Sequence, residues 1–177
     1  KSDASVYYFA SSDKERVTKS IHKEEICAIG NHTIVTREQV QMYTKFYEIT
    51  YDKTLSEKKA IAYAKERNAL YVAAMQNGYQ VTDEQVKAYV EELKQNLDGI
   101  WTKEQKEKLL SGFASEDDYW AFEQKVYRID LPIQNYVRDK ENEFNRKNES
   151  GQTWDEAFKT LKQNLVDEQQ YKDSSSY

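Results

Sequence analysis

The sequence holds few of the side chains that usually carry catalysis or bind metal ions. It has one cysteine, Cys27, and two histidines, His22 and His32. Cys27 lies in the apolar stretch 26–29, which favours a small buried side chain over a reactive thiol. His22 and Glu25 could share a metal ion, but a zinc site needs about four ligands and the sequence offers no obvious third. We therefore predict no catalytic residue, no metal site and no cofactor.

Adjacent acidic residues are the remaining candidates for acid–base chemistry. Such pairs occur at 24–25, 91–92 and 117–118. Neighbouring positions on a helix point about 100° apart, so the two carboxyl groups of a pair would not face one substrate. Acids near the start of a helix also stabilise the positive end of its dipole. We interpret these acids as structural and expect no enzymatic activity.

Aromatic residues are the strongest candidates for a binding surface. They make up 13% of the chain, which has 14 tyrosines. Seven of them recur at helical spacing or gather near later turns: Tyr43, Phe46, Tyr47, Tyr51, Trp101, Tyr119 and Trp120. One interpretation is a tyrosine-rich core that replaces leucine. The other is a groove that binds extended or unfolded polypeptide, because aromatic rings give a large contact area at low entropic cost. Tyr119 and Trp120 cannot both face one side of a helix, so one points outward or the core surrounds both.

Composition and charge exclude several classes of protein. Lysine and arginine number 26 against 31 acids, a net charge of −5, and the two signs are interleaved. The sequence therefore predicts no basic stripe for a nucleic acid. The longest apolar run, residues 69–75, is far shorter than the roughly 20 residues that span a bilayer. Five glycines and one proline argue against turn-rich β folds and favour a mainly α-helical protein.

Five helix starts stand out in the sequence. Four are capping boxes, in which a threonine hydroxyl accepts from the amide three residues on and the side chain there reaches back. They begin at Thr36, Thr82, Thr102 and Thr153, and Ser115 before three acids is a weaker fifth start. These positions predict where most of the helices begin.

Glycines mark three of the expected helix ends. Gly78, Gly99 and Gly112 follow runs of helical spacing, and glycine ends helices in the left-handed conformation at the lowest cost. Pro132 lies inside a long helix that starts at 116, so we expect a kink or a break there. The other expected helices cover residues 57–77, 83–98, 103–111 and 154 to about 170.

The segments between these helices give less regular patterns. Two short β-branched pieces flank Gly30 and Asn31, which predicts a small hairpin or bent strand near residues 26–35. Residues 6–9 could form a strand or a helical turn. The nearly all-polar stretch 139–149 is either a solvated helix end or a hinge before the last helix.

The order of these motifs resembles one known family. The pieces IVTREQV, ALYVAAMQNGYQVTDEQVKAYVEEL and SGFASEDDYWAFEQKVYRIDLPIQNYV follow one another as in the N-terminal core domain of SurA/PrsA-type extracytoplasmic foldases. The similarity covers about residues 26–137 and is most specific at 78–86 and 112–120. The helix from Thr153 is similar to the C-terminal helix that returns to complete the family's chaperone domain. The family's turn is usually Asn-Gly, whereas this chain has Gly-Asn at Gly30.

The resemblance implies a multi-helix chaperone domain without the family's enzyme. In these foldases a parvulin-type rotamase domain usually lies between the long helix and the returning helix. The corresponding connection here, residues 138–152, is far too short to hold one. The implied organisation is an N-terminal segment 1–25, a helical core 26–137, the polar connection 138–152, a C-terminal helix 153–171 that packs back on the core, and a disordered tail 172–177.

Two functions follow as expectations. The first is non-enzymatic, chaperone-like binding of unfolded or extended polypeptide outside the cytoplasm. The polar first residues are compatible with export and with a lipid anchor that precedes Lys1, which would be the sole contact with a membrane. The second is a structural module that docks a dedicated partner or forms a homodimer by helix exchange.

Overall fold

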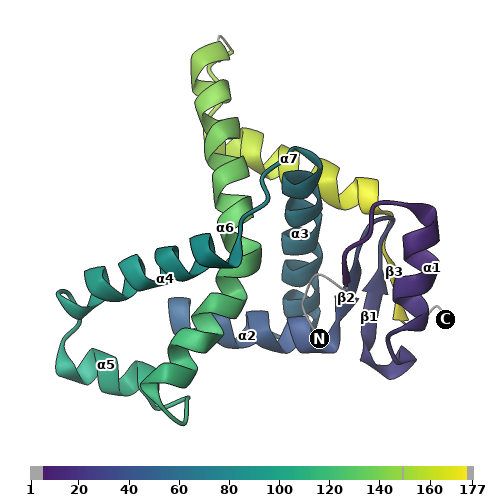
Figure 1. The fold of residues 1–177 in the computed structure, drawn as a ribbon. Coiled ribbons are helices and arrows are strands. Elements are labelled where there is room, and N and C mark those ends of the chain that lie inside the picture. The colour runs from purple at the N-terminus through teal and green to yellow at the C-terminus, as the bar shows by residue number, and fades with distance from the viewer. Residues whose placement is uncertain (1–5, 149, 175–177) are drawn as a thin grey trace.

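The computed structural model describes residues 6–148 and 150–174 (Figure 1). Within them the chain forms seven α-helices and one three-stranded antiparallel sheet, which confirms the predicted mainly α-helical class. The elements in chain order are α1 (Ser11–Lys19), the 3-10 turn η2 (Lys23–Glu25), β1 (Ile26–Ile29), β2 (Ile34–Thr36), α2 (Arg37–Tyr51), α3 (Glu57–Gln76), α4 (Asp83–Asp98), α5 (Lys103–Leu110), α6 (Glu116–Lys147), α7 (Trp154–Gln169) and β3 (Lys172–Asp173).

The predicted helix starts are all confirmed. At the start of α2, the Gln39 backbone N–H donates to the Thr36 hydroxyl at 3.2 Å, and the Thr36 N–H donates to the Gln39 side-chain oxygen at 3.3 Å. The same reciprocal bonds start α4, α5 and α7, and Ser115 caps α6 through its hydroxyl. Each cap contributes about 1 kcal/mol of helix stability, so these few neighbouring residues favour the observed helix starts.

The helix ends follow the glycine prediction at one position. Gly78 ends α3 with a φ of +85°, as expected. Gly99 has a φ of −84°, so the left-handed prediction is wrong there, because the chain leaves α4 in a right-handed turn. Gly112 is also outside the left-handed region. Two residues that are not glycine, Asp52 and Gln170, adopt the left-handed conformation after α2 and α7.

Pro132 does not break α6. The helix runs uninterrupted over 32 residues, so the predicted break is wrong, although its axis bends between the two halves in Figure 1. The ring of Pro132 is fully buried. The polar stretch 139–149 is a solvated helix end, because α6 continues to Lys147 and only a short connection precedes α7.

The sheet confirms the predicted hairpin and corrects the predicted tail. β1 and β2 pair antiparallel around the Gly30 turn, with Ile29 opposite Ile34. β3 pairs antiparallel with the other edge of β1, so the strand order is β2-β1-β3. Lys172–Asp173 is therefore an ordered strand rather than part of a disordered tail, and residues 175–177 lie outside the described residues.

The described part of segment 1–25 also has defined structure. Tyr7 forms an isolated antiparallel bridge with Thr33, and helix α1 follows, which the sequence did not predict. A buried network joins this segment to the helices: the Tyr7 hydroxyl contacts Asn68 at 3.3 Å and Gln39 at 3.2 Å, and Asn68 donates to Gln39 at 3.0 Å. These hydrogen bonds give the buried polar groups the partners that they need. They also connect the N-terminal segment to α2 and α3.

The C-terminal segment packs closely against the hairpin turn. The Asn31 N–H donates to the Gln169 carbonyl at 2.7 Å, and the Tyr171 hydroxyl donates to the Lys65 carbonyl at 2.7 Å. A Cβ on Gly30 would lie 2.7 Å from the side-chain oxygen of Gln169 and 2.9 Å from the ring of Tyr171. The glycine is needed there for close approach.

Replacing Gly30 by alanine is therefore expected to lower the free energy of unfolding by about 1–3 kcal/mol, the usual range for overpacking. Urea unfolding of the wild type and the variant gives this difference. Gly112→Ala is the matched control, because nothing lies within 4 Å of a Cβ there. Equal stability of Gly30→Ala and Gly112→Ala would contradict the close packing of the C-terminal segment against Gly30.

The described residues form four buried apolar clusters, and the separation of the two largest positions the candidate site. The central cluster lies between the sheet, α2, α3, α7 and the middle of α6, around Tyr43, Leu70 and Ile133. The second lies between α4, α5 and the first half of α6, around Val90 and Trp120. Figure 1 shows α4 and α5 projecting to one side of the molecule, away from the sheet. We call α4 and α5 together the arm.

Candidate functional site: an aromatic groove beside the arm

The structure divides the seven predicted aromatic residues into two groups. Tyr43, Tyr119 and Trp120 are buried, with exposed fractions of 0%, 3% and 7%. These three support the core, as the first interpretation proposed, and cannot contact a ligand while the fold is intact. The accessible members are the half-buried Phe46, Tyr47 and Trp101 and the exposed Tyr51.

Tyr119 and Trp120 are both buried because the arm encloses the start of α6. Tyr119 contacts Phe113 edge-on at a centroid distance of 5.2 Å, and Trp120 stacks on Trp101 at 6.2 Å. Trp101 lies in the connection between α4 and α5, so the arm covers one side of this aromatic cluster. Of the two predicted arrangements, the core that surrounds both residues is the correct one.

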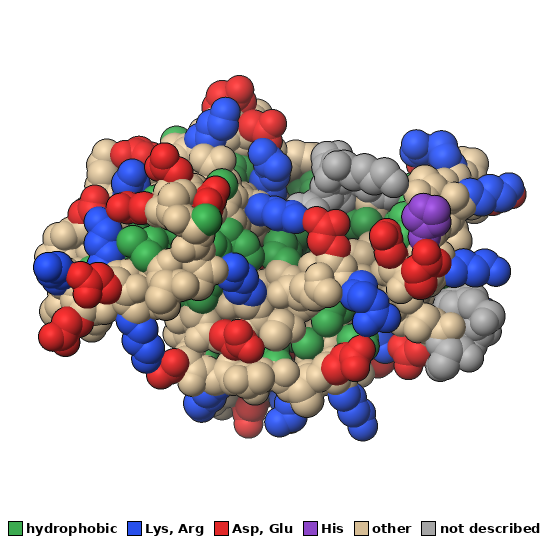
Figure 2. Space-filling model, turned by 90° about the horizontal axis from the view of Figure 1, so that it is seen from below, with side chains coloured by type: hydrophobic (Ala, Val, Ile, Leu, Met, Phe, Trp, Pro, Cys, Tyr) green, Lys and Arg blue, Asp and Glu red, His purple; other side chains and the backbone are tan. Residues whose placement is uncertain are grey.

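A groove of about 400 Å³ separates the end of α2 from α5. We call it the arm groove. Ile49, Trp101 and Leu109 provide its apolar surface. Its polar lining residues include Glu48, Asp52, Gln105 and Lys108. The groove thus combines an accessible indole and two aliphatic side chains with charges of both signs, and Figure 2 shows hydrophobic side chains exposed between charged ones on this side of the molecule.

Two polar contacts join the helices on either side of the arm groove. The Lys108 ammonium lies 3.2 Å from the Asp52 carboxylate, and both side chains are exposed. Lys45 donates to the Gly112 carbonyl at 3.0 Å and lies 3.8 Å from the centre of the Phe113 ring. The second contact anchors α2 to the connection before α6. The exposed pair of Lys108 and Asp52 contributes little to stability and can exchange for other partners.

A row of tyrosines joins α2 to α3. Tyr43 contacts Tyr63 at 5.5 Å, Tyr63 contacts Tyr47 at 6.2 Å, and Tyr47 contacts Tyr51 at 4.7 Å. The row runs from the buried core to the surface, where Tyr51 is 56% exposed. Of the seven predicted aromatic residues, only Trp101 lines the arm groove, and Phe46, Tyr47 and Tyr51 do not.

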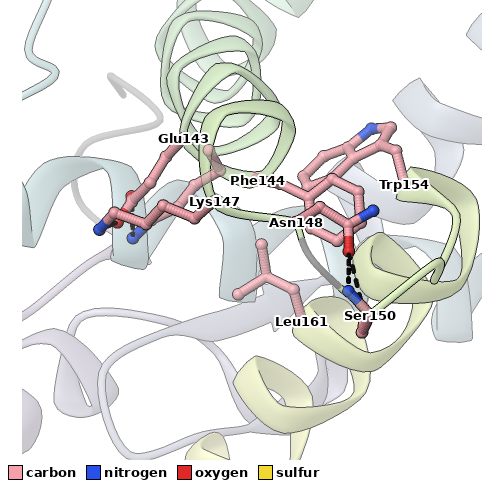
Figure 3. Close-up of a pocket in the computed structure, with 8 residues that line it drawn as sticks. Glu143, Phe144, Lys147, Asn148, Ser150, Trp154 and Leu161 are labelled. Atoms are coloured by element: carbon pink, nitrogen blue, oxygen red, sulfur yellow. Dashed lines mark hydrogen bonds and ion pairs between the residues drawn. The ribbon is translucent and has the colours of Figure 1, made fainter.

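Sequence reasoning missed a second pocket, between the end of α6 and the start of α7 (Figure 3). We call it the elbow pocket. Its volume is about 550 Å³ and its lining residues are Lys140, Glu143, Phe144, Lys147, Asn148, Ser150, Trp154 and Leu161. One signal was present in the sequence: Phe144 is the single large apolar residue in the polar stretch 139–149.

A buried carboxyl group lies beside the cluster that the arm covers. Glu123 of α6 is 4% exposed and hydrogen-bonds to the Tyr119 hydroxyl. Burial raises the pKa of Glu123 to about 7, the Tyr119 hydrogen bond opposes this, and the nearby Asp130 carboxylate adds to it. Burial also raises the pKa values of Tyr119 and Tyr127, which keeps both phenols neutral.

The described residues contain no arrangement typical of a catalytic or metal centre. Cys27 is buried, and burial raises the pKa of its thiol, so the thiolate nucleophile is disfavoured. No group of three or more His, Cys, Asp or Glu side chains could hold a metal ion among residues 6–148 and 150–174. In the same residues, no helix combines the length and apolar character that crossing a bilayer requires.

Comparison with known proteins gives no match: neither a protein-family model, nor a curated protein, nor a solved structure is similar to the chain. The resemblance to SurA/PrsA-type foldases therefore stays a prediction that rests on the motifs of the sequence.

Proposed function

We propose that this protein binds unfolded or extended polypeptide without catalysing a reaction, and that the arm groove is its main contact surface. One observation carries the proposal: Trp101, Ile49 and Leu109 form an accessible apolar surface between α2 and the arm, beside Glu48, Asp52 and Lys108. The apolar part can bury side chains of many sequences, and charges of both signs can pair with either sign on a client.

The size of the arm groove fits this type of ligand. Its volume of about 400 Å³ lies near the lower end of the range of about 300–1,000 Å³ that is usual for ligand sites. One or two large side chains of a peptide would fill it, while the peptide backbone stays hydrated. Such a contact is small, so we expect weak binding with a dissociation constant in the micromolar range.

The resemblance to the chaperone core of SurA/PrsA-type foldases supports the same function. It adds the proposal that the protein works outside the cytoplasm, and that it lacks peptidyl-prolyl isomerase activity. The connection between α6 and α7 is only a few residues long, so no rotamase domain is inserted there.

We expect no isomerase activity, because prolyl rotation is accelerated by a pocket that binds the twisted amide better than the planar one. In a refolding assay limited by proline isomerisation, micromolar protein should leave the rate of the slow phase unchanged. Acceleration that grows with protein concentration and survives repurification would contradict the proposal.

The arm groove should also account for chaperone-like activity. The wild type is expected to slow the aggregation of a reduced, unfolded client, measured by light scattering, and Leu109→Asp should lose most of this effect. The introduced charge opposes burial of apolar client side chains, and Leu109 is only half-buried, so the fold should survive. Phe9→Asp is the matched control, since Phe9 is also accessible, at 49%, and does not line the groove. Equal protection by both variants would contradict a role for the groove.

A second candidate function is docking of a dedicated partner or a second copy of the chain. Ile100, at the tip of the arm, favours it, because this large apolar side chain is 73% exposed. Light scattering over a concentration series separates the two functions. A monomer at all concentrations agrees with client binding, whereas a tight dimer that covers Trp101 would favour the second candidate.

A further inference from the structure

The elbow pocket has an aromatic wall of its own, separate from the arm groove. Phe144 and Trp154 contact each other at a centroid distance of 5.7 Å, and Trp154 stacks on Phe158 at 5.3 Å with an interplanar angle of 13°. Leu161 adds an aliphatic side chain one turn further along α7. All four side chains are half-buried, so apolar area remains for a ligand to cover.

Among the described residues that line the pocket, cations outnumber anions. Lys140 and Lys147 both line it, and Glu143 lies between them in sequence. The Glu143 carboxylate is 2.9 Å from the Lys147 ammonium and 3.8 Å from that of Lys140. Two lysines thus share one carboxylate, so the described lining residues carry one excess positive charge in a protein whose net charge is −5.

The dipoles of the two helices that end at the pocket do not change its excess of positive charge. The C-terminal end of α6 carries a partial negative charge and the N-terminal end of α7 a partial positive charge, so the two contributions offset each other. The side chains of Lys140 and Lys147 therefore decide the sign of a preferred ligand. In Figure 3, Lys147 and Glu143 lie on one side of the pocket, and Phe144 and Trp154 lie on the other.

Hydrogen bonds among its described residues hold the connection between α6 and α7 in place beside the pocket. The Asn148 side-chain oxygen accepts from the Ser150 backbone N–H at 3.2 Å and from the Ser150 hydroxyl at 2.9 Å. The Asn148 amide donates to the Gln152 carbonyl at 2.7 Å. A pocket that is formed in advance loses little conformational entropy when a ligand binds.

We propose that the elbow pocket binds a polypeptide segment in which a carboxylate side chain stands next to an aromatic one. The ring covers Phe144, Trp154 and Leu161, and the carboxylate replaces part of the Glu143 pairing with Lys140 and Lys147. This inference rests on the proposed polypeptide binding and adds a second site with its own selectivity. An acidic and aromatic segment matches both sides of the pocket at once.

The three tryptophans of the chain allow a test with one signal for each location. Trp101 lies at the arm groove, Trp120 is buried, and Trp154 lies in the elbow pocket. The indole N–H signals of the ¹⁵N-labelled full chain are assigned with single Trp→Phe variants. The probes are three capped pentapeptides with the sequences SFDFS, SFNFS and SFKFS, each titrated to millimolar concentration.

The expected result is a shift of the Trp154 signal with SFDFS, about threefold weaker apparent affinity with SFNFS and weaker still with SFKFS. Phe144→Ala should reduce the apparent affinity for SFDFS about tenfold. The double variant Lys140→Gln/Lys147→Gln should remove the preference for SFDFS. Lys58→Gln/Lys87→Gln, which has the same net charge, should keep it, because neither lysine lines the pocket.

A Trp154 signal that does not move, or that moves equally with SFDFS and SFKFS, would overturn the inference. A shift of Trp101 by an unfolded client with no shift of Trp154 by the peptides would overturn it while leaving the proposed function intact. The opposite result, with Trp154 shifting and Trp101 silent, would support the elbow pocket and count against the arm groove.

Discussion

Removing the carboxylate of Asp130 is expected to lower the free energy of unfolding by about 3–5 kcal/mol, the usual range when one partner of a buried ion pair is deleted. The Arg67 guanidinium lies 2.6 Å from Asp130, and the two side chains are only 16% and 7% exposed. The pair joins α3 to α6. Burial alone would lower the pKa of Arg67, and the Asp130 carboxylate more than offsets this, so Arg67 stays charged.

The comparison of three variants tests this account of the ion pair. Asp130→Ala strands a buried positive charge, whereas Arg67→Met combined with Asp130→Leu removes both charges and keeps much of the volume. The double variant should therefore be less destabilised than Asp130→Ala in urea unfolding. Glu107→Gln is the control, because its pair with Lys103 at 3.8 Å is exposed, and its cost should stay below about 1 kcal/mol. A double variant as unstable as the single one would contradict the account.

Replacing Glu123 by glutamine is expected to stabilise the protein at pH 8 by about 2–4 kcal/mol and to change little at pH 4. The folded state holds the pKa of Glu123 at about 7, above the ordinary value of 4.5, so it binds the proton more tightly than the unfolded chain does. The wild type therefore loses stability as the pH rises from about 4.5 to about 7. This difference in pKa between the folded and unfolded states corresponds to about 3 kcal/mol.

Glutamine removes this pH dependence because it has the shape of the protonated side chain and can still accept from the Tyr119 hydroxyl. The measurement is urea unfolding of the wild type and the variant at several pH values between 4 and 8. Glu92→Gln, at an exposed position of α4, should follow the wild type at every pH. A constant difference between the wild type and Glu123→Gln across this range would refute the assignment.

The helix boundaries could be predicted because they depend on a few neighbouring residues. The Thr36 hydroxyl and the Gln39 side chain lie three positions apart in the sequence and bond to each other in the structure. Pro132 shows the limit of such local rules, which allow either a kink or a break in the helix. The structure has the bend without the break, and the ring of Pro132 is fully buried.

The proposed binding surface was harder to predict because burial depends on elements that are distant in sequence. Helical spacing alone made Tyr43 and Tyr51 equal candidates for the binding surface. In the structure, Tyr43 is fully buried against Tyr63 of α3, and Tyr51 is exposed at the end of α2. Tyr119 and Trp120 are covered by the arm, whose position no local pattern specifies. The elbow pocket joins Phe144 to Trp154 across a chain reversal, which the sequence did not reveal.

Fluorescence anisotropy tests most directly whether the arm groove binds unfolded polypeptide, as we propose. A labelled, reduced and alkylated polypeptide is titrated with the full chain. We predict saturable binding with a dissociation constant of about 10–100 μM, about tenfold weaker binding by Leu109→Asp, and unchanged binding by Phe9→Asp. No saturable binding by the wild type, or an equal loss in both variants, would contradict the claim.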